Sequence, residues 1–297
     1  MNIILGGYWF YYIYRIKTPV MKNILLLTDF SDPSKNAIAY ALQLFSNTEC
    51  TFHVLYVQDS SAYITDDVVS QATTSLYDSL VNKNRLKLID YVAELESEFD
   101  TKSFSFKVIV DYDSLIDAVQ QNITSKHIDL IVMGTSGATG AKEVVFGSNT
   151  LQVVRRIECN TLIIPKDYKY QQPKAMLLAL EPTDLLSGRS VTDFFQFLKA
   201  HTLQLHVLRF TADAEQQRIN TGDMDVLNSQ MPDAPYQYHQ IVQVPMVYAV
   251  GTYLQTNAID MVGLIAHHET FLERLFLGSA TTEMCKHAEF PLLIFHA

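Results

Sequence analysis

Apolar runs of strand length alternate with amphipathic stretches along the first half of this 297-residue chain. The runs are nearly unbroken, which is typical of parallel strands that are covered on both faces of a sheet. Between them, apolar residues recur at helical spacing, as Ala37, Ala41 and Phe45 do after Asp32. The predicted strands are 23–28, 51–57, 104–110, 128–133 and 161–164, and the predicted helices include 32–45, 75–98 and 114–122.

The same order of motifs occurs twice. The paired segments are Lys22–Asp29 with Lys174–Glu181, Phe52–Leu55 with Leu205–Leu208, Ile128–Val132 with Ile259–Gly263, Val145–Ser148 with Phe276–Ser279, and Thr161–Ile164 with Leu292–Phe295. The separation is 152 or 153 residues in the first two pairs and 131 in the others. The second copy is therefore shorter in its middle, where the polar residues 211–237 predict a loop with at most a short helix.

Alternating strands and helices imply parallel strands joined by crossovers, so we expect two tandem, doubly wound α/β domains with open parallel sheets. The polar segment Lys166–Pro173 carries no apolar period and marks the boundary. We expect one domain at 21–166, a linker at 167–173 and a second domain at 174–297.

The first twenty residues are apolar and aromatic, which is unusual beside the rest of the chain. The stretch is too short for a spanning helix, which needs roughly 20 apolar residues, and no basic residue precedes it as in a signal peptide. Met21 stands just before the first predicted strand. We expect Met21 to be the biological start and 1–20 to lie outside the fold; a weak membrane-surface anchor is the alternative.

Composition narrows the function classes. A hydrophobic content of 48% is ordinary for a globular protein, and a net charge of −10 with no basic run argues against nucleic acid as a partner. Cys50, Cys159 and Cys285 are far apart and have no zinc-site spacing, which favours reduced thiols in a cytoplasmic protein.

A glycine-rich segment follows the apolar run that ends at Met133. Gly134 and Gly137 stand after the predicted strand, and Gly147 with Ser148 opens the next predicted helix. Free N–H groups at such a helix start favour anions, and glycines let a phosphate come close. Asp29 ends the first strand, where a carboxylate suits a ribose hydroxyl or a metal. The alternative is that the glycines only build a loop and a helix start.

The spacing Gly134-x2-Gly137-x9-Gly147-Ser148 resembles the ATP-binding signature of universal stress proteins. The segments Ile24–Ser31, Asp129–Gly134 and Cys159–Pro165 are similar to the same family. The resemblance implies an adenine nucleotide α-hydrolase-like fold in its tandem, two-domain form, with ATP, with or without Mg²⁺, in the first domain. It implies contacts to ribose and base from Thr28 and Asp29, to adenine from Val57, to ribose and phosphates from Gly134 and Gly137, and to phosphates from Gly147, Ser148 and Asn149.

The sequence departs from the family pattern in the first copy and more strongly in the second. Leu27 replaces a proline, and Asp111–Asp113 stands where a glycine is expected. In the second copy both leading glycines and the small strand-end residue are lost, so we predict that this domain does not bind ATP as the first does. The replacements are Glu181 for Asp29, Phe210 for Val57, Ile265 for Gly134 and His268 for Gly137.

No metal site is predicted. His267 and His268 are adjacent, so their rings point different ways in a regular element, and the sequence places no third ligand. His53 and His206 occupy matching strand positions, which predicts a packing role.

The leading hypothesis is an ATP-binding regulatory protein of the stress response with an unknown protein partner. A ligand-free structural or interaction module is the alternative. A slow ATPase ranks last, because Lys142 and Asp29 are the only charged groups placed near the loop and no catalytic residue is assigned. The resemblance also implies pairing of the strands 161–164 and 292–295 within one chain as a pseudo-dimer, with homodimers as a further option.

Overall fold

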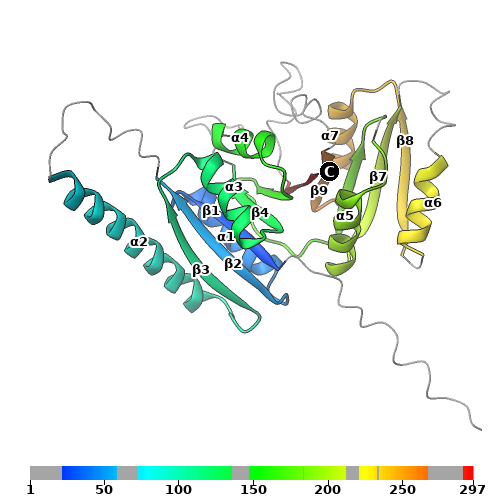
Figure 1. Ribbon diagram of the computed structural model, residues 1–297. Coiled ribbons are helices and arrows are strands. Elements are labelled where there is room, and N and C mark those ends of the chain that lie inside the picture. The colour runs from blue at the N-terminus through cyan, green and yellow to red at the C-terminus, as the bar shows by residue number, and fades with distance from the viewer. Residues whose placement is uncertain are drawn as a thin grey trace, which may run out of the picture.

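The computed structural model describes residues 22–58, 72–135, 147–182, 184–211, 221–232, 234–266 and 290–296. Its strands form one ten-stranded sheet in the order β3-β2-β1-β4-β5-β10-β9-β6-β7-β8 (Figure 1). The first half supplies β1 (Asn23–Thr28), β2 (Cys50–Val57), β3 (Phe104–Asp111), β4 (Leu130–Gly134) and β5 (Thr161–Ile164). The second half supplies β6 (Ala175–Leu180), β7 (Gln204–Thr211), β8 (Tyr236–Val242), β9 (Met261–Ala266) and β10 (Leu292–His296).

The two halves meet at one antiparallel strand pair. Leu162 of β5 lies opposite Leu293 of β10, and the other strand pairs are parallel. The predicted pairing of these two segments within one chain is therefore confirmed, as is the fold class of two tandem, doubly wound α/β units. We call this β5–β10 pair the seam.

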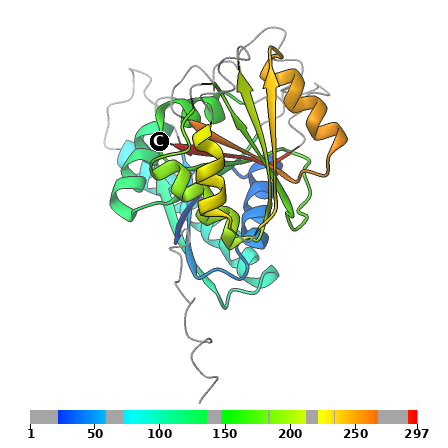
Figure 2. The ribbon, with the colours of Figure 1, turned by 90° about the vertical axis from the view of Figure 1, so that its right-hand side faces the viewer.

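Helices cover both faces of the sheet. α1 (Asp32–Leu44), α2 (Ala72–Glu98), α5 (Arg189–Ala200) and α6 (Thr221–Gln230) lie over one face. α3 (Leu115–Lys126), α4 (Ser148–Arg156) and α7 (Met246–Thr256) lie over the other. Figure 2 shows this sandwich in the second half, with α5 and α6 on one side of β7 and β8 and α7 on the other. Successive residues of β1 alternate between the two cores, so nearly the whole strand is buried.

Local sequence explains where the helices begin. Ser31 caps α1 by accepting a hydrogen bond from the Ser34 N–H, and a proline lies in the first turn. Ser114 caps α3 in the same way through Asp117, and α3 ends at His127 in the left-handed region. α3 runs to Lys126, four residues beyond the predicted end at 122. The polar stretch 211–237 holds the short helix α6, as expected.

The repeat extends to side-chain contacts. The Asp129 carboxylate accepts hydrogen bonds from the backbone N–H groups of Lys22 and Asn23 at 2.8 and 2.9 Å. Asp260, 131 residues later, accepts the corresponding bonds at the start of β6, at 2.7 and 3.0 Å. Each carboxylate fixes the first strand of its half beside the strand that follows the aspartate.

The segment between β5 and β6 packs against both halves. The Asn36 side chain of α1 donates to the backbone carbonyls of Pro165 and Tyr168, and the Tyr168 hydroxyl donates to the carbonyl of Asp260. His201, just after α5, packs on the ring of Phe45 at 5.5 Å between ring centroids. None of the helices in the described ranges is both long and apolar enough to cross a membrane.

Candidate functional site

The turn after β1 is held by a network of side chains. Thr28 is buried, and its hydroxyl lies 3.1 Å from the Ser34 hydroxyl and accepts the Phe30 N–H at 3.0 Å. Asp29 is exposed and accepts hydrogen bonds from the backbone N–H and the hydroxyl of Ser31. Partial burial raises the pKa of Asp29, but the bonds from Ser31 and Ser34 outweigh burial and lower the net pKa. The carboxylate is therefore charged and fixed near neutral pH.

Phe30 connects this turn to α2. Its backbone has φ of 65°, in the left-handed region that a phenylalanine rarely adopts. Its ring lies 4.9 Å from that of Tyr56 at the end of β2, and the Lys87 ammonium sits 3.8 Å from the ring centroid. These ring contacts offset the backbone strain and pin the turn that presents Asp29.

Gly134 has a steric reason to be glycine. A Cβ at this position would lie 2.4 Å from the carbonyl oxygen of Pro33, in the first turn of α1. The backbone of β4 and the start of α1 therefore approach closely only because the side chain is missing. The sequence predicted a glycine for approach to phosphates, whereas in the structure the close neighbour is the protein's own helix.

The start of α4 has features that suit an anion. Gly147 is its N-cap and offers no side-chain hydrogen bond, and Ser148 and Asn149 in the first turn are exposed. That turn contains no acidic residue, while Arg155 and Arg156 lie in the last turn. Among the described residues, no side chain caps the N–H groups of this first turn, which lie at the positive end of the helix dipole.

Three strand ends bring these pieces to one edge of the sheet. Thr28 lies opposite Tyr56, and the β1–β4 register continues to place Thr28 level with Gly134. Val57 follows at the end of β2 and is half-buried. The Thr150 hydroxyl of α4 donates to the Gly134 carbonyl at 3.4 Å, which holds the α4 start beside this edge. We call this arrangement the nucleotide edge, after the ligand that the sequence predicts there.

Part of the predicted site lies outside the described residues. Gly137, the rest of the loop at 138–146 and Lys142 belong to that part, as do His267, His268 and the second copy's Gly278-Ser279. Within the part of the chain that the structure describes, no group of three or more His, Cys, Asp or Glu side chains has the arrangement of a metal site.

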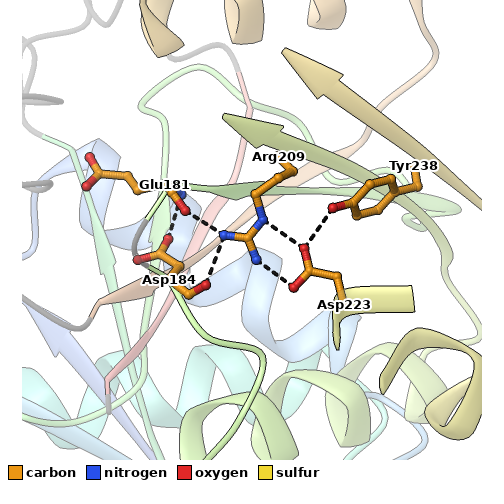
Figure 3. Close-up of polar contacts among 5 residues, drawn as sticks. All are labelled: Glu181, Asp184, Arg209, Asp223 and Tyr238. Atoms are coloured by element: carbon orange, nitrogen blue, oxygen red, sulfur yellow. Dashed lines mark hydrogen bonds and ion pairs between the residues drawn. The ribbon is translucent and has the colours of Figure 1, made fainter. Parts of the chain in front are cut away.

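The corresponding edge of the second half is closed by a buried ion pair (Figure 3). Arg209 is fully buried at the position of Tyr56, and its guanidinium binds both oxygens of Asp223 at 2.8 Å. It also donates to the backbone carbonyls of Glu181 and Asp184, at 2.5 and 2.9 Å. The Tyr238 hydroxyl completes the set by donating to Asp223 at 2.7 Å. We call these five residues the Arg209 cluster.

The cluster engages the backbone at the end of β6 and the first turn of α6. The carbonyl of Glu181, the counterpart of Asp29, accepts from the Arg209 guanidinium, and Asp223 comes from the first turn of α6. Sequence inspection missed this cluster. The available signal was an arginine inside the apolar strand sequence Val207–Phe210, since a charge there needs a buried partner.

The loop before α5 explains why Ile265 is tolerated where the first half has Gly134. Residues 181–188 separate β6 from α5, whereas only 29–31 separate β1 from α1. The close contact of β9 lies instead at Gly263, two residues before Ile265. A Cβ there would meet the end of the Met176 side chain at 2.7 Å and the Phe194 ring at 3.2 Å.

Comparison with known proteins identifies the first half. The model of the universal stress protein family matches residues 21–165. These residues belong to the universal stress protein family. The resemblance inferred from the glycine spacing is thereby confirmed, and the matched range contains the whole nucleotide edge.

Two curated universal stress proteins align with the chain. One from Methanocaldococcus jannaschii is 25% identical over 153 residues, which cover 50% of this chain and 84% of the relative. One from Synechocystis sp. is 24% identical over 300 residues, which cover 93% of this chain and 100% of the relative. The second alignment is consistent with a tandem form.

Solved universal stress protein structures share the fold over both halves. A crystal structure from Archaeoglobus fulgidus superposes with a TM-score of 0.71 at 15% identity, covering 93% of this chain and 98% of that one. A putative universal stress protein from Pseudomonas aeruginosa gives a TM-score of 0.58 at 12% identity, covering 94% of each chain.

Proposed function

We propose that this universal stress protein is a regulatory protein of the stress response that binds ATP, with or without Mg²⁺, at the nucleotide edge of its first half. The observation that carries the proposal is the uncapped start of α4, held against the end of β4 by the Thr150–Gly134 bond. The N–H groups of this helix start suit phosphates, and Asp29 on the neighbouring strand suits ribose hydroxyls.

The second half takes no nucleotide in this proposal. The Arg209 guanidinium satisfies the strand-end carbonyls from within the chain, and Phe210 replaces Val57 beside them. Occupancy of the first half by ATP is then the signal that a protein partner reads. A cytoplasmic setting belongs to the same proposal and is supported by Cys50 and Cys159, which are buried and unpaired.

The test is calorimetric titration of the full chain with ATP, with and without Mg²⁺, alongside a Ser148→Asp variant. Aspartate at this exposed position suits the helix start, so the fold is retained. Its charge, however, would oppose a bound phosphate by about 4 kcal/mol at a separation of ~4 Å and an effective dielectric constant of ~20. We therefore expect ATP binding to weaken at least about tenfold.

Ser46→Asp is the matched control, because Ser46 is exposed and lies beyond the opposite end of α1. It should bind ATP as the unmodified chain does. No binding by the unmodified chain, or equal binding by Ser148→Asp, would refute the proposal.

A ligand-free interaction module is the second candidate. Its support is Gly134, which the contact with Pro33 requires whether or not a nucleotide is present. Absence of any ATP response in the titration would favour this module. Phosphate release from bound ATP, measured in the same samples, would instead favour the slow ATPase.

A further inference from the structure

An open pocket of about 550 Å³ lies along β3, the strand at one edge of the sheet. Its wall combines side chains from separate elements: His53 of β2, Arg85 of α2, Lys107 of β3 and Lys126 of α3. Figure 1 shows α2 and α3 flanking β3 at this end of the molecule. Because these residues are far apart in sequence, they form no basic run from which the pocket could be predicted.

The positive charges of this pocket have no ion-pair partners among the described residues. The salt bridges found in those ranges are Lys102–Asp100, Arg189–Asp193 and Arg209–Asp223, none of which involves the pocket. Of the described residues that line the pocket wall, none is acidic either. In a chain of net charge −10, this is a local concentration of uncompensated positive charge.

His53 forms a buried part of the wall. Only 7% of it is exposed, and Nε2 lies 3.4 Å from the Asn23 side-chain oxygen. Nδ1 is shielded from solvent and has no hydrogen-bond partner in the described structure. Burial lowers the pKa of His53, and the charges of Lys126 and Lys107 lower it further. A buried imidazole thus stands beside two ammonium groups that have no ion-pair partner in the described part of the chain.

At the position that corresponds to His53, the second half has neutral neighbours and a tyrosine that fills the space. His206 matches His53, and its neighbour across the strand pair is Gln237, where His53 has Lys107. The Tyr253 hydroxyl of α7 lies 2.8 Å from His206 Nδ1 and donates to Gln237 at 3.3 Å. The repeat separation of 131 residues places Tyr253 at Asn122 and Asn257 at Lys126.

In the first half, the residue that corresponds to Tyr253 bonds within its own helix instead of to the histidine. Asn122 donates to the carbonyl of Ala118 in its own helix at 2.8 Å, so it leaves His53 Nδ1 unsatisfied. The first half therefore differs from the second at this place by two added lysines and by a histidine nitrogen that no tyrosine contacts. Added positive charge beside an unsatisfied polar atom fits a bound anion better than it fits a packing change.

We propose that this pocket is a second ligand site, which binds a small polyvalent anion of the phosphate class through Lys107 and Lys126, with Arg85 also on its wall. It is separate from the nucleotide edge, because His53 lies three residues from the start of β2 and Lys126 ends α3. His53 and Lys107 lie in the middle of their strands and Lys126 precedes β4, whereas ATP is proposed beyond the carboxyl ends of β1, β2 and β4.

The test uses inorganic pyrophosphate as the probe and the His53 imidazole as a local reporter. The full chain is titrated at low ionic strength, since salt screens such contacts, and histidine side-chain NMR signals are followed. The His53 signal is assigned by its absence in His53→Gln. We expect a saturable shift at His53 and none at His206, with citrate, a polycarboxylate, binding more weakly than pyrophosphate.

The decisive variant copies the second half. Lys107→Gln with Lys126→Asn should weaken the response roughly tenfold or more, whereas Lys102→Gln removes a remote, exposed lysine and should change nothing. Ser148→Asp should leave the His53 response intact, so failure of ATP binding and failure of this site can be told apart. A His53 signal that does not move, or that moves equally in the double variant, overturns the proposal.

Discussion

Removing one charge of the Arg209–Asp223 pair should destabilise the protein far more than removing both. Arg209→Met deletes four hydrogen bonds and leaves Asp223, only 6% exposed, as an unpaired buried charge. Loss of one partner of a buried pair typically costs about 3–5 kcal/mol. Asp223→Leu leaves the buried guanidinium without its charged partner, so we expect a loss of stability of the same size.

The double variant Arg209→Met/Asp223→Leu removes both charges and fills the space with apolar groups. Such replacements of buried pairs are often neutral, so the double variant should lose only about 0–2 kcal/mol and be more stable than either single variant. The assay is urea unfolding followed by circular dichroism, with hydrogen exchange in α6 to locate the change.

A surface pair in the same half supplies the control. Arg189 and Asp193 are 3.8 Å apart on α5, and the arginine side chain is 87% exposed. Arg189→Met should change stability by less than about 1 kcal/mol. If the two single losses at Arg209 and Asp223 simply add in the double variant, the two residues are not energetically coupled and the account of the cluster is wrong.

Two further predictions follow from burial. His201 and His296 both have their pKa lowered to about 4 by burial, so the unfolded chain binds protons that the folded chain does not, and stability should fall as pH drops from about 6.5 to about 4. At pH 5 each histidine should account for about 2 kcal/mol of loss, and urea midpoints of His201→Leu should show a correspondingly smaller acid effect; an unchanged effect would count against this assignment. Gly134→Ala should destabilise by about 1–3 kcal/mol, because its Cβ meets the rigid backbone of Pro33, while Gly263→Ala should cost less because the flexible end of Met176 can move. Equal losses in thermal melts of the two variants would contradict this distinction.

The fold was predictable because its signals are local or repeated. The apolar runs placed β1 and β5 at their exact residues, and the family resemblance implied the seam through Thr161–Ile164 and Leu292–Phe295. Helix ends were less certain. α3 continues past Asn122 to Lys126 because its termination depends on His127 adopting a left-handed conformation, which no strong sequence signal indicates.

The site was only partly predictable, because its decisive features are contacts between distant segments. The open start of α4 follows from Gly147 and Ser148, which the motif contains. The reason for Gly134 depends on how closely α1 approaches β4, and the closure of the second half depends on Asp223 reaching Arg209 from another element. Neither contact can be deduced from the spacing of residues along the chain.

The seam also releases the chain from a constraint of symmetric assemblies. In a dimer of identical subunits, every substitution appears at both related positions, so a cluster that closes one site closes its twin as well. Here the β5–β10 pair joins two different sequences, and the short, packed segment between Ile164 and Ala175 keeps them together at any dilution. One half can therefore acquire a buried arginine at its strand ends while the other keeps Tyr56 at the matching position. Because the two halves are different parts of one chain, a substitution can specialise one half without changing the other.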